Sequence, residues 1–303
     1  MKYFLTILAW WHLLVPLAAQ PAADPLVVAT YAYGSNSRED NIGPLAREMG
    51  RAMNCPVRVQ SYPNVLALLV ALQAGQVDVA FLNTLGYISL QSERPNDLVA
   101  LARLQTPAND PNAYRACLVA RREAGLASLE AAAKQAAALR LVFAGRYSTS
   151  GHLVPRLQLA RLGLENPEDH CRKAYFATSH AAVLDELRAG RADVGACGLG
   201  EFMQLQARGE ANDLQLLWAS DPIPLGPVVC RATLPDARQQ ALRQLLLTVH
   251  ELRPKDFAQL CKGWAEALNS TRFVAVKPYE YEAFFKVANT GTALRNLLSQ
   301  YMH

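Results

Sequence analysis

Short apolar runs alternate with segments of helical spacing through the first ninety residues of the chain. Residues 26–31 form an apolar run rich in β-branched side chains, whereas residues 42–53 place apolar side chains three or four positions apart. The pattern predicts three strands and two helices, at residues 26–31, 42–53, 57–61, 65–74 and 77–82. This order of strand and helix favours a parallel sheet covered by helices.

The alternation returns in the second half of the chain. Strands are predicted at residues 115–120, 139–144, 173–177, 193–197, 214–220 and 227–231. Helices are predicted at residues 126–138, 150–162, 180–189, 235–251, 255–267 and 280–300. The sequence Gly75-Gln-Val-Asp-Val-Ala has an echo in Gly190-Arg-Ala-Asp-Val-Gly, and in both a glycine ends a helix and an aspartate opens a strand.

Two α/β modules in series predict two lobes. We expect lobe 1 to comprise residues 24–112 and 233–303, and lobe 2 to comprise residues 113–232. The chain then crosses between the lobes twice, near residues 109–115 and near residues 227–233. Such a protein can close like a hinge on a ligand, and ligands of open α/β sheets bind at the carboxyl ends of strands. The expected fold is therefore α/β, with a ligand cleft between lobes joined by two crossing strands.

The N-terminal residues 1–23 have the layout of a secretory signal peptide. Lys2 provides a positive charge, an apolar run extends from Phe4 to Ala19, and small residues follow. The alternative is an N-terminal membrane anchor, against which Pro16 and the small residues argue. Cleavage is expected between Ala19 and Ala23, so we expect a periplasmic protein.

Composition excludes some classes of partner and leaves the cysteines open. The chain of 303 residues has a formal net charge of +4, and its basic residues are dispersed rather than gathered in a run, so a nucleic-acid partner is not expected. The six cysteines stand singly and have no metal-ligand spacing. An exported protein permits disulfides, and six cysteines allow about 15 full pairings. Cys117 and Cys230 are one candidate pair, if they lie on neighbouring crossing strands.

The segment from Ala144 to Pro155 joins a predicted strand to a predicted helix. Ser148, Thr149 or Ser150 is expected to cap this helix. Free N–H groups, the positive end of the helix dipole and three hydroxyl groups can hold an oxyanion without a cation. Gly151 lets the backbone approach the ligand closely. The alternative is an ordinary helix cap with additional polar residues.

A second turn of this kind follows the strand at residues 173–177. Ser179 and His180 stand where the next helix begins, at the expected carboxyl edge of the same sheet. His180 can donate a hydrogen bond to an anion there. The alternative is a surface histidine.

Lobe 1 offers two further candidate walls of a site. Asn83 and Thr84 follow the strand at residues 77–82, and Tyr87 lies one helical turn further on. Tyr33 begins a polar loop after the first strand. The alternative for Tyr87 is packing in the core.

Taken together, these stretches resemble the substrate-binding proteins of phosphate, phosphite and phosphonate ABC transporters, the phosphonate-binding branch of the type II periplasmic binding proteins. The resemblance runs from about residue 26 to about residue 250. It rests on Ser148-Thr149-Ser150-Gly151 with Pro155, Ser179-His180, the Gly-x-Val-Asp strand with downstream Tyr87, Ala192-Asp193-Val194-Gly195 and Ser220-x-Pro222-Ile223-Pro224.

The resemblance implies a type II periplasmic-binding-protein-like fold, a small oxyanion ligand, an ABC permease of the inner membrane as partner, a monomer and no cofactor. It implies that Ser148, Thr149, Ser150 and His180 hold the phosphorus oxygens, and that Tyr87 closes from lobe 1. Members often have Gly-Pro where Asn83-Thr84 stand, and a tyrosine where Val65 stands. Both departures fall in the lobe 1 wall, which is expected to contact the variable part of the ligand.

Two other functions fit parts of the sequence. A hydrolase would use Ser150 with His152, but there is no Gly-x-Ser-x-Gly elbow and no identifiable group to orient the base, so we do not expect an enzyme. A binding protein that feeds a membrane sensor kinase, or one for a different small anion, remains an alternative to transport.

Overall fold

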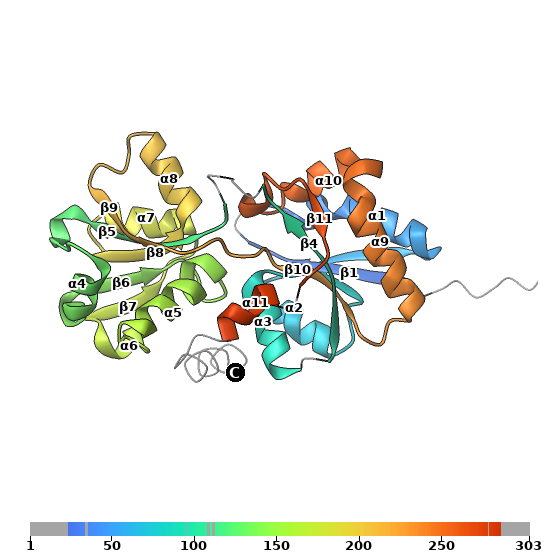
Figure 1. Ribbon diagram of the computed structural model, residues 1–303, viewed down its shortest axis with the longest axis horizontal. Helices are drawn as coiled ribbons and strands as arrows, with labels where there is room; N and C mark the ends of the chain where they lie inside the picture. The colour runs from blue at the N-terminus through green and yellow to red at the C-terminus, as the bar shows by residue number, and fades with distance from the viewer. Residues whose placement is uncertain are drawn as a thin grey trace, which may run out of the picture.

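The computed structural model has two lobes that lie side by side (Figure 1). It describes residues 24–33, 36–94, 96–107, 110, 113–277 and 279–285. The predicted signal peptide at residues 1–23 lies outside the described residues, as does most of the helix predicted at residues 280–300. Within the described ranges, no helix combines the length and the apolar character that a membrane crossing requires.

Lobe 1 is built on a six-stranded sheet. Its strand order is β11-β4-β10-β3-β1-β2. The strands are β1 (Leu26–Tyr31), β2 (Val57–Tyr62), β3 (Val79–Phe81), β4 (Leu98–Gln105), β10 (Pro227–Arg231) and β11 (Arg272–Val274). The helices are α1 (Arg38–Met53), α2 (Val65–Gln73), α3 (Thr84–Glu93), α9 (Asp236–Leu252), α10 (Pro254–Cys261) and α11 (Tyr279–Phe285), with a 3-10 turn at Ala265–Ala267.

Lobe 2 is built on a five-stranded sheet of order β7-β6-β8-β5-β9. The strands are β5 (Ala116–Arg121), β6 (Arg140–Phe143), β7 (Lys173–Phe176), β8 (Val194–Gly198) and β9 (Leu214–Ala219). The helices are α4 (Leu129–Lys134), α5 (Val154–Arg161), α6 (Pro167–His170), α7 (His180–Arg188) and α8 (Leu199–Ala207). Shorter turns are η1 (Arg122–Ala124), η2 (Ala136–Ala138) and the π-helical η3 (Thr149–Leu153).

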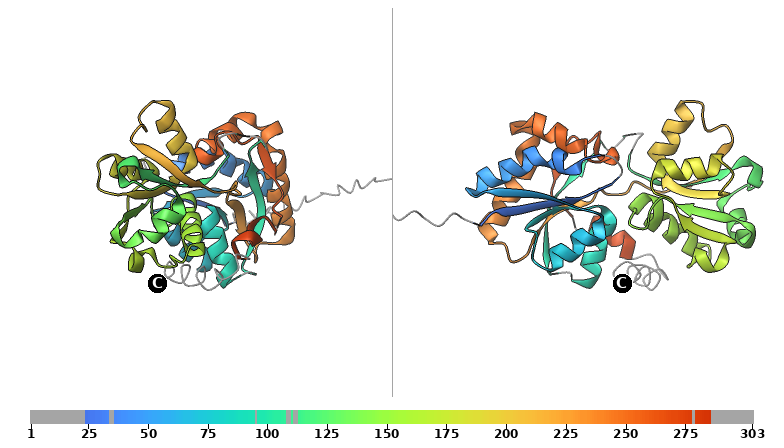
Figure 2. Two further views of the ribbon diagram at one scale, coloured as in Figure 1. Left: turned by 60° about the vertical axis from the view of Figure 1, so that its left-hand side comes forward. Right: turned by 180° about the vertical axis from the view of Figure 1, so that it is seen from behind.

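Helices cover both faces of each sheet, as the view from behind also shows (Figure 2). In lobe 1, α1, α9 and α10 contribute to the apolar cluster on one face, and α2 and α3 to the cluster on the other. In lobe 2, α7 and α8 pack on one face, and α4 and α5 on the other. The central strands are therefore mostly apolar, and every residue of β1 and β8 is buried.

The two sheets repeat one arrangement. The order β2-β1-β3-β10-β4 in lobe 1 corresponds to β7-β6-β8-β5-β9 in lobe 2, and in both only the fourth strand runs antiparallel to the other four. The two aspartates of the sequence echo have matching contacts. Asp78 accepts the N–H of Val27 at 2.8 Å, and Asp193 accepts the N–H of Arg140 at 2.8 Å. Each of these hydrogen bonds comes from the start of a neighbouring parallel strand.

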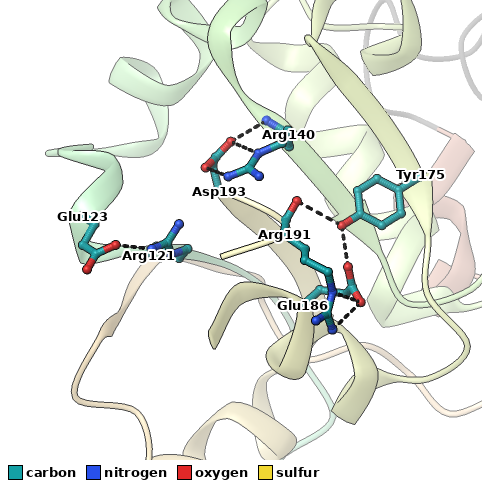
Figure 3. Close-up of polar contacts among 7 residues, drawn as sticks. All are labelled: Arg121, Glu123, Arg140, Tyr175, Glu186, Arg191 and Asp193. Carbon is teal, nitrogen blue, oxygen red and sulfur yellow. Dashed lines mark hydrogen bonds and ion pairs between the residues drawn. The ribbon is translucent and has the colours of Figure 1, made fainter. Parts of the chain in front are cut away.

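An arginine completes each of these aspartate sites. Arg231 Nε donates to Asp78 at 2.6 Å. Arg140 Nε donates to Asp193 at 2.9 Å, as Figure 3 shows. The guanidinium of Arg140 lowers the pKa of the Asp193 carboxyl group, chiefly by hydrogen bonding. The echo in the sequence therefore marks a structural unit used once in each lobe.

The second crossing lies earlier than predicted. β9 belongs to the lobe 2 sheet, whereas β10 pairs with β3 and β4 in lobe 1. The first crossing therefore lies between β4 and β5 and the second at residues 220–226, and β10, which we predicted within lobe 2 (residues 113–232), lies in the sheet of lobe 1. A strand such as β10 is assigned by its hydrogen-bonded neighbours, which the local pattern does not reveal.

The same topology rules out the candidate disulfide between Cys117 and Cys230. Cys117 lies on β5 in lobe 2, and Cys230 lies on β10 in the sheet of lobe 1. The six cysteines are all described, and none is disulfide-bonded in the structure. The residue opposite Cys117 is Cys197, on β8.

Candidate functional site

A cleft of about 650 Å³ lies between the lobes. Both lobes and the first crossing contribute polar and aromatic side chains to its walls. They include Tyr31, Tyr33, Arg38, Asn83, Tyr114, Arg146, Ser148, Thr149, Ser150, His180, Glu201 and Glu266. Among the residues that the structure describes, no group of three or more His, Cys, Asp and Glu side chains is placed to hold a metal ion.

The hydroxyl-rich turn after β6 forms one wall of this cleft. Ser148 caps the helix, since its Oγ accepts the N–H of Gly151 at 3.0 Å. The first turn, Thr149–Leu153, is π-helical and runs directly into α5. Single π-helical turns are often found at functional sites. The N–H groups of Thr149 and Ser150 belong to this first turn, so the hydrogen bonds of the helix itself do not use them.

Gly151 is required by its surroundings. A Cβ atom at this position would lie 2.4 Å from Cβ of Ala144, 2.9 Å from Cε1 of His180 and 3.0 Å from Oγ of Ser148. The absence of a side chain therefore lets the imidazole ring pack against the capped turn. Gly151 itself does not line the cleft.

His180 is held in one tautomer by the strand beside it. The N–H of Gly198 donates to Nδ1 of His180 at 3.0 Å. A neutral imidazole that accepts through Nδ1 carries its proton on Nε2. His180 lines the cleft and can donate a hydrogen bond to a ligand there. Its neighbour Ser179 instead caps α7, by accepting the N–H of Ala182 at 3.1 Å, and does not line the cleft.

The predicted lobe 1 residues have three different positions. Asn83 lines the cleft, caps α3 and donates from Nδ2 to the carbonyl oxygen of Tyr147 in lobe 2 at 2.9 Å. Thr84 is buried away from the cleft and donates to the carbonyl oxygen of Pro224 in the second crossing at 2.6 Å. Tyr87 packs edge-on against the ring of Tyr281, with centroids 4.8 Å apart, so the cleft wall does not include it.

Sequence reasoning missed a basic residue in this wall. Arg38, the first residue of α1, is only 5% exposed. Its guanidinium lies 4.5 Å from the ring centroid of Tyr31 and 5.1 Å from that of Tyr33, and its Nε donates to the carbonyl oxygen of Gly263 at 2.9 Å. A signal was present, because Arg38 directly follows the segment from Tyr33 to Ser37 that we proposed as a wall.

Two carboxylates of the cleft were missed as well. Glu266, in the 3-10 turn of lobe 1, is a cleft residue, and burial raises the pKa of its carboxyl group against the opposing charge of Arg38. Glu201 enters the cleft from the first turn of α8 in lobe 2. The cleft therefore combines hydrogen-bond donors for an anion with two acidic side chains.

Three buried polar atoms of the cleft residues lack a hydrogen-bond partner among the described residues. They are Oγ of Ser150, the hydroxyl oxygen of Tyr33 and Nη1 of Arg38. A buried donor without a partner costs about 1–3 kcal/mol. Tyr114 lies close to Ser150, and burial raises the pKa of its phenol, so its hydroxyl group stays protonated. A ligand rich in acceptor oxygens would satisfy these groups.

His152 does not serve as a base for Ser150. It is 1% exposed, its Nδ1 is 2.7 Å from the carbonyl oxygen of Arg146, and its ring packs edge-on against Phe143 and Phe176. Burial, with a contribution from the charge of Arg156, lowers its pKa to about 3. The side chain of His152 is therefore packed in the interior of lobe 2, against Phe143 and Phe176, and does not face Ser150 as a base would.

Comparison with known proteins gives a consistent result. The family model for periplasmic substrate-binding proteins of phosphonate ABC transporters matches residues 28–281. The probable ABC transporter phosphite binding protein PhnD1 of Prochlorococcus marinus is 23% identical over 258 residues, which cover 82% of this chain and 84% of the relative.

Solved structures show the same fold. PhnD1 from P. marinus in complex with methylphosphonate has a TM-score of 0.67 at 19% identity, covering 90% of this chain and 97% of that one. XAC2383 from Xanthomonas citri bound to ATP has a TM-score of 0.72 at 18% identity, covering 92% and 99%. The predicted type II periplasmic-binding-protein fold is confirmed. This chain belongs to the family of periplasmic substrate-binding proteins of phosphonate ABC transporters.

Proposed function

We propose that the cleft captures a small phosphorus oxyanion, such as phosphate, phosphite or a phosphonate, and presents it to an ABC permease. The unpartnered Ser150 Oγ, Tyr33 hydroxyl and Arg38 Nη1 carry this proposal, because all three are buried in residues that line one cleft. The protein binds its ligand without converting it. Delivery to a sensor kinase would use the same site.

The anion docks first on the turn of lobe 2. The N–H groups of Thr149 and Ser150, the hydroxyl group of Ser148 and Nε2–H of His180 all lie on that wall. Arg38 adds a fixed positive charge from lobe 1, and an arginine can donate two parallel hydrogen bonds to such an anion. Closure then excludes water and strengthens these hydrogen bonds.

The rest of the cleft favours a particular kind of phosphonate. Its volume of about 650 Å³ leaves space beside a phosphorus oxyanion. Glu201 on the wall disfavours further negative charge, such as a polyphosphate chain, and a cationic substituent would favour the ionised form of Glu266. An aminoalkylphosphonate therefore fits better than a nucleotide.

Calorimetric titration of the ligand-free protein tests this function. The panel comprises phosphate, phosphite, methylphosphonate, an aminoalkylphosphonate, ATP and sulfate. We expect one phosphorus oxyanion to bind tightly, and the Ser150→Ala variant to bind it about tenfold to a hundredfold more weakly. Ser128→Ala is the matched control, since Ser128 caps α4 by accepting the N–H of Ala131 at 3.2 Å and lies outside the cleft.

The outcomes of this titration separate the possibilities. Tight binding of ATP or sulfate in preference to the phosphonates would contradict the proposed ligand class. A Ser150→Ala variant that binds as tightly as Ser128→Ala would contradict the proposed site.

A further inference from the structure

Two cysteines face each other beneath the ligand cleft. Cys117 on β5 and Cys197 on β8 are direct partners across an antiparallel pair. Their sulfur atoms are 3.5 Å apart, and both residues are fully buried.

The type of strand pairing suits a covalent link. Along the same ladder, the N–H of Arg121, four positions after Cys117, donates to the carbonyl oxygen of Asp193. The N–H of Leu199, two positions after Cys197, donates to the carbonyl oxygen of Arg115. Since hydrogen-bonded pairs recur at every second residue, Cys117 and Cys197 are such a pair, for which the Cα atoms are about 5.5 Å apart. Disulfides span Cα separations of about 4.4–6.8 Å.

We propose that Cys117 and Cys197 form a disulfide in the exported protein. The periplasm, where this family functions, is an oxidising compartment in which structural disulfides persist. The sulfur–sulfur bond forms when both thiols lose their protons and the pair gives two electrons to the disulfide of a thiol–disulfide oxidoreductase, which becomes a dithiol.

Because the pair is buried, the disulfide must form before folding is complete. The neighbouring thiol of Cys117 and burial hold the pKa of Cys197 well above its usual range, so the thiolate needed for exchange is suppressed after folding. Both residues are fully enclosed by the folded lobe. The bond is therefore made while the chain is still folding, before β5 and β8 close the sheet.

The disulfide would fix the positions of two backbone segments next to the ligand cleft. Cys197 directly precedes Gly198, whose N–H orients His180. Cys117 follows Ala116, whose N–H donates to Oγ of Ser220 at 3.0 Å, where the second crossing begins. The disulfide ties these two anchoring points together through the two central strands of lobe 2.

Peptide mapping tests the proposal directly. The full chain is exported, recovered from the periplasm, denatured in an alkylating reagent without reductant and digested with trypsin. We expect four alkylated cysteines and one cross-linked pair of peptides, Ala116–Arg121 with Ala192–Arg208, each of which contains a single cysteine. Six alkylated cysteines, or a cross-link that involves another cysteine such as Cys230, would overturn the proposal.

A stability measurement gives an independent check. Wild type refolded from denaturant with reductant should have a Tm on the order of 10 °C below that of wild type refolded without it, because the bond closes a long loop. Cys197→Ser should not respond to reductant, whereas Cys171→Ser, which changes a cysteine outside the pair, should respond as the wild type does. An unresponsive wild type would contradict the disulfide even if Cys197→Ser failed to fold.

Discussion

Oγ1 of Thr149, in lobe 2, accepts the backbone N–H of Leu85, in lobe 1, at 3.1 Å. Around this bond, Leu85 and Ile88 of α3 form an apolar cluster with Leu153 and Leu157 of η3 and α5. The turn that we propose for the anion is thus also a point where the lobes touch. Binding of the ligand and contact between the lobes therefore share one short segment.

Replacing Thr149 by valine should affect both properties. The change keeps the shape of the side chain but leaves the N–H of Leu85 without its acceptor. We expect the free energy of unfolding to fall by about 1–2 kcal/mol and ligand affinity to fall about tenfold. Urea unfolding and calorimetric titration measure the two effects. Thr248→Val on α9, where the hydroxyl group bonds only within its own helix, is the control, and equal behaviour of the two variants would contradict this role.

A single methyl group at Gly151 should disrupt the site. Its Cβ would displace the imidazole of His180 or the cap of Ser148, so we expect Gly151→Ala to weaken ligand binding about tenfold or more. Gly43→Ala, in α1 and outside the cleft, brings its added atom no nearer than 3.6 Å, to Nη1 of Arg47, and should bind as the wild type does. Titration of both variants decides the matter, and a normal affinity for Gly151→Ala would refute the packing argument.

His152 predicts how stability depends on pH. Its pKa is about 3 in the folded protein, against 6.5 as its ordinary value. Below about pH 6.5 only the unfolded chain takes up the proton, so this contribution to stability is lost progressively as the pH falls towards 3. Between pH 7 and pH 5 the loss should be about 2 kcal/mol. Urea unfolding at both pH values should show a smaller fall in the free energy of unfolding for His152→Gln than for the wild type. An equal fall in both proteins would contradict the role of His152.

The two equivalent aspartates should respond alike to substitution. Asp193→Asn removes a carboxylate that accepts hydrogen bonds from Arg140, and Asp78→Asn removes the corresponding acceptor for Val27 and Arg231. Each variant should lose about 2 kcal/mol of unfolding free energy in urea, whereas Asp213→Asn, at an exposed position, should lose little.

The Asp193 site also has a pH signature. Because the pKa of Asp193 is lowered in the folded protein, its contribution is present above the ordinary pKa of the group and is lost as the pH falls through the lowered value. Unfolding experiments in this acidic range should show a shallower decline for Asp193→Asn than for the wild type. Parallel curves would argue against the ion pair as the cause.

Local chemistry made part of the site predictable from the sequence. Ser148, Gly151 and His180 stand where a strand ends and a helix starts, and such a junction limits the backbone and the cap within a few residues. The turns that form the lobe 2 wall could therefore be predicted from short segments of sequence. Ser179 and Thr84 were placed in the right turns but are used for a cap and for contact with the second crossing.

The remaining parts depend on contacts between distant segments. Arg38 is fixed by Gly263, 225 positions later in the chain, and Glu266 comes from the same C-terminal region. The spacing of hydrophobic residues along the sequence does not show which distant segments come into contact. The strands β4 and β11 were not predicted, the latter because three residues give too short a pattern. Tyr87 was assigned to the ligand because the position of Tyr281, its packing partner, was unknown.

The position of β10 dictates an order of assembly. This strand lies between β3 and β4 in the sheet of lobe 1, yet it follows the whole of lobe 2 in the chain. As the polypeptide emerges from a ribosome or a membrane pore, lobe 2 is complete by residue 219, while lobe 1 still lacks an inner strand. The lobe that begins first is therefore the last to be completed.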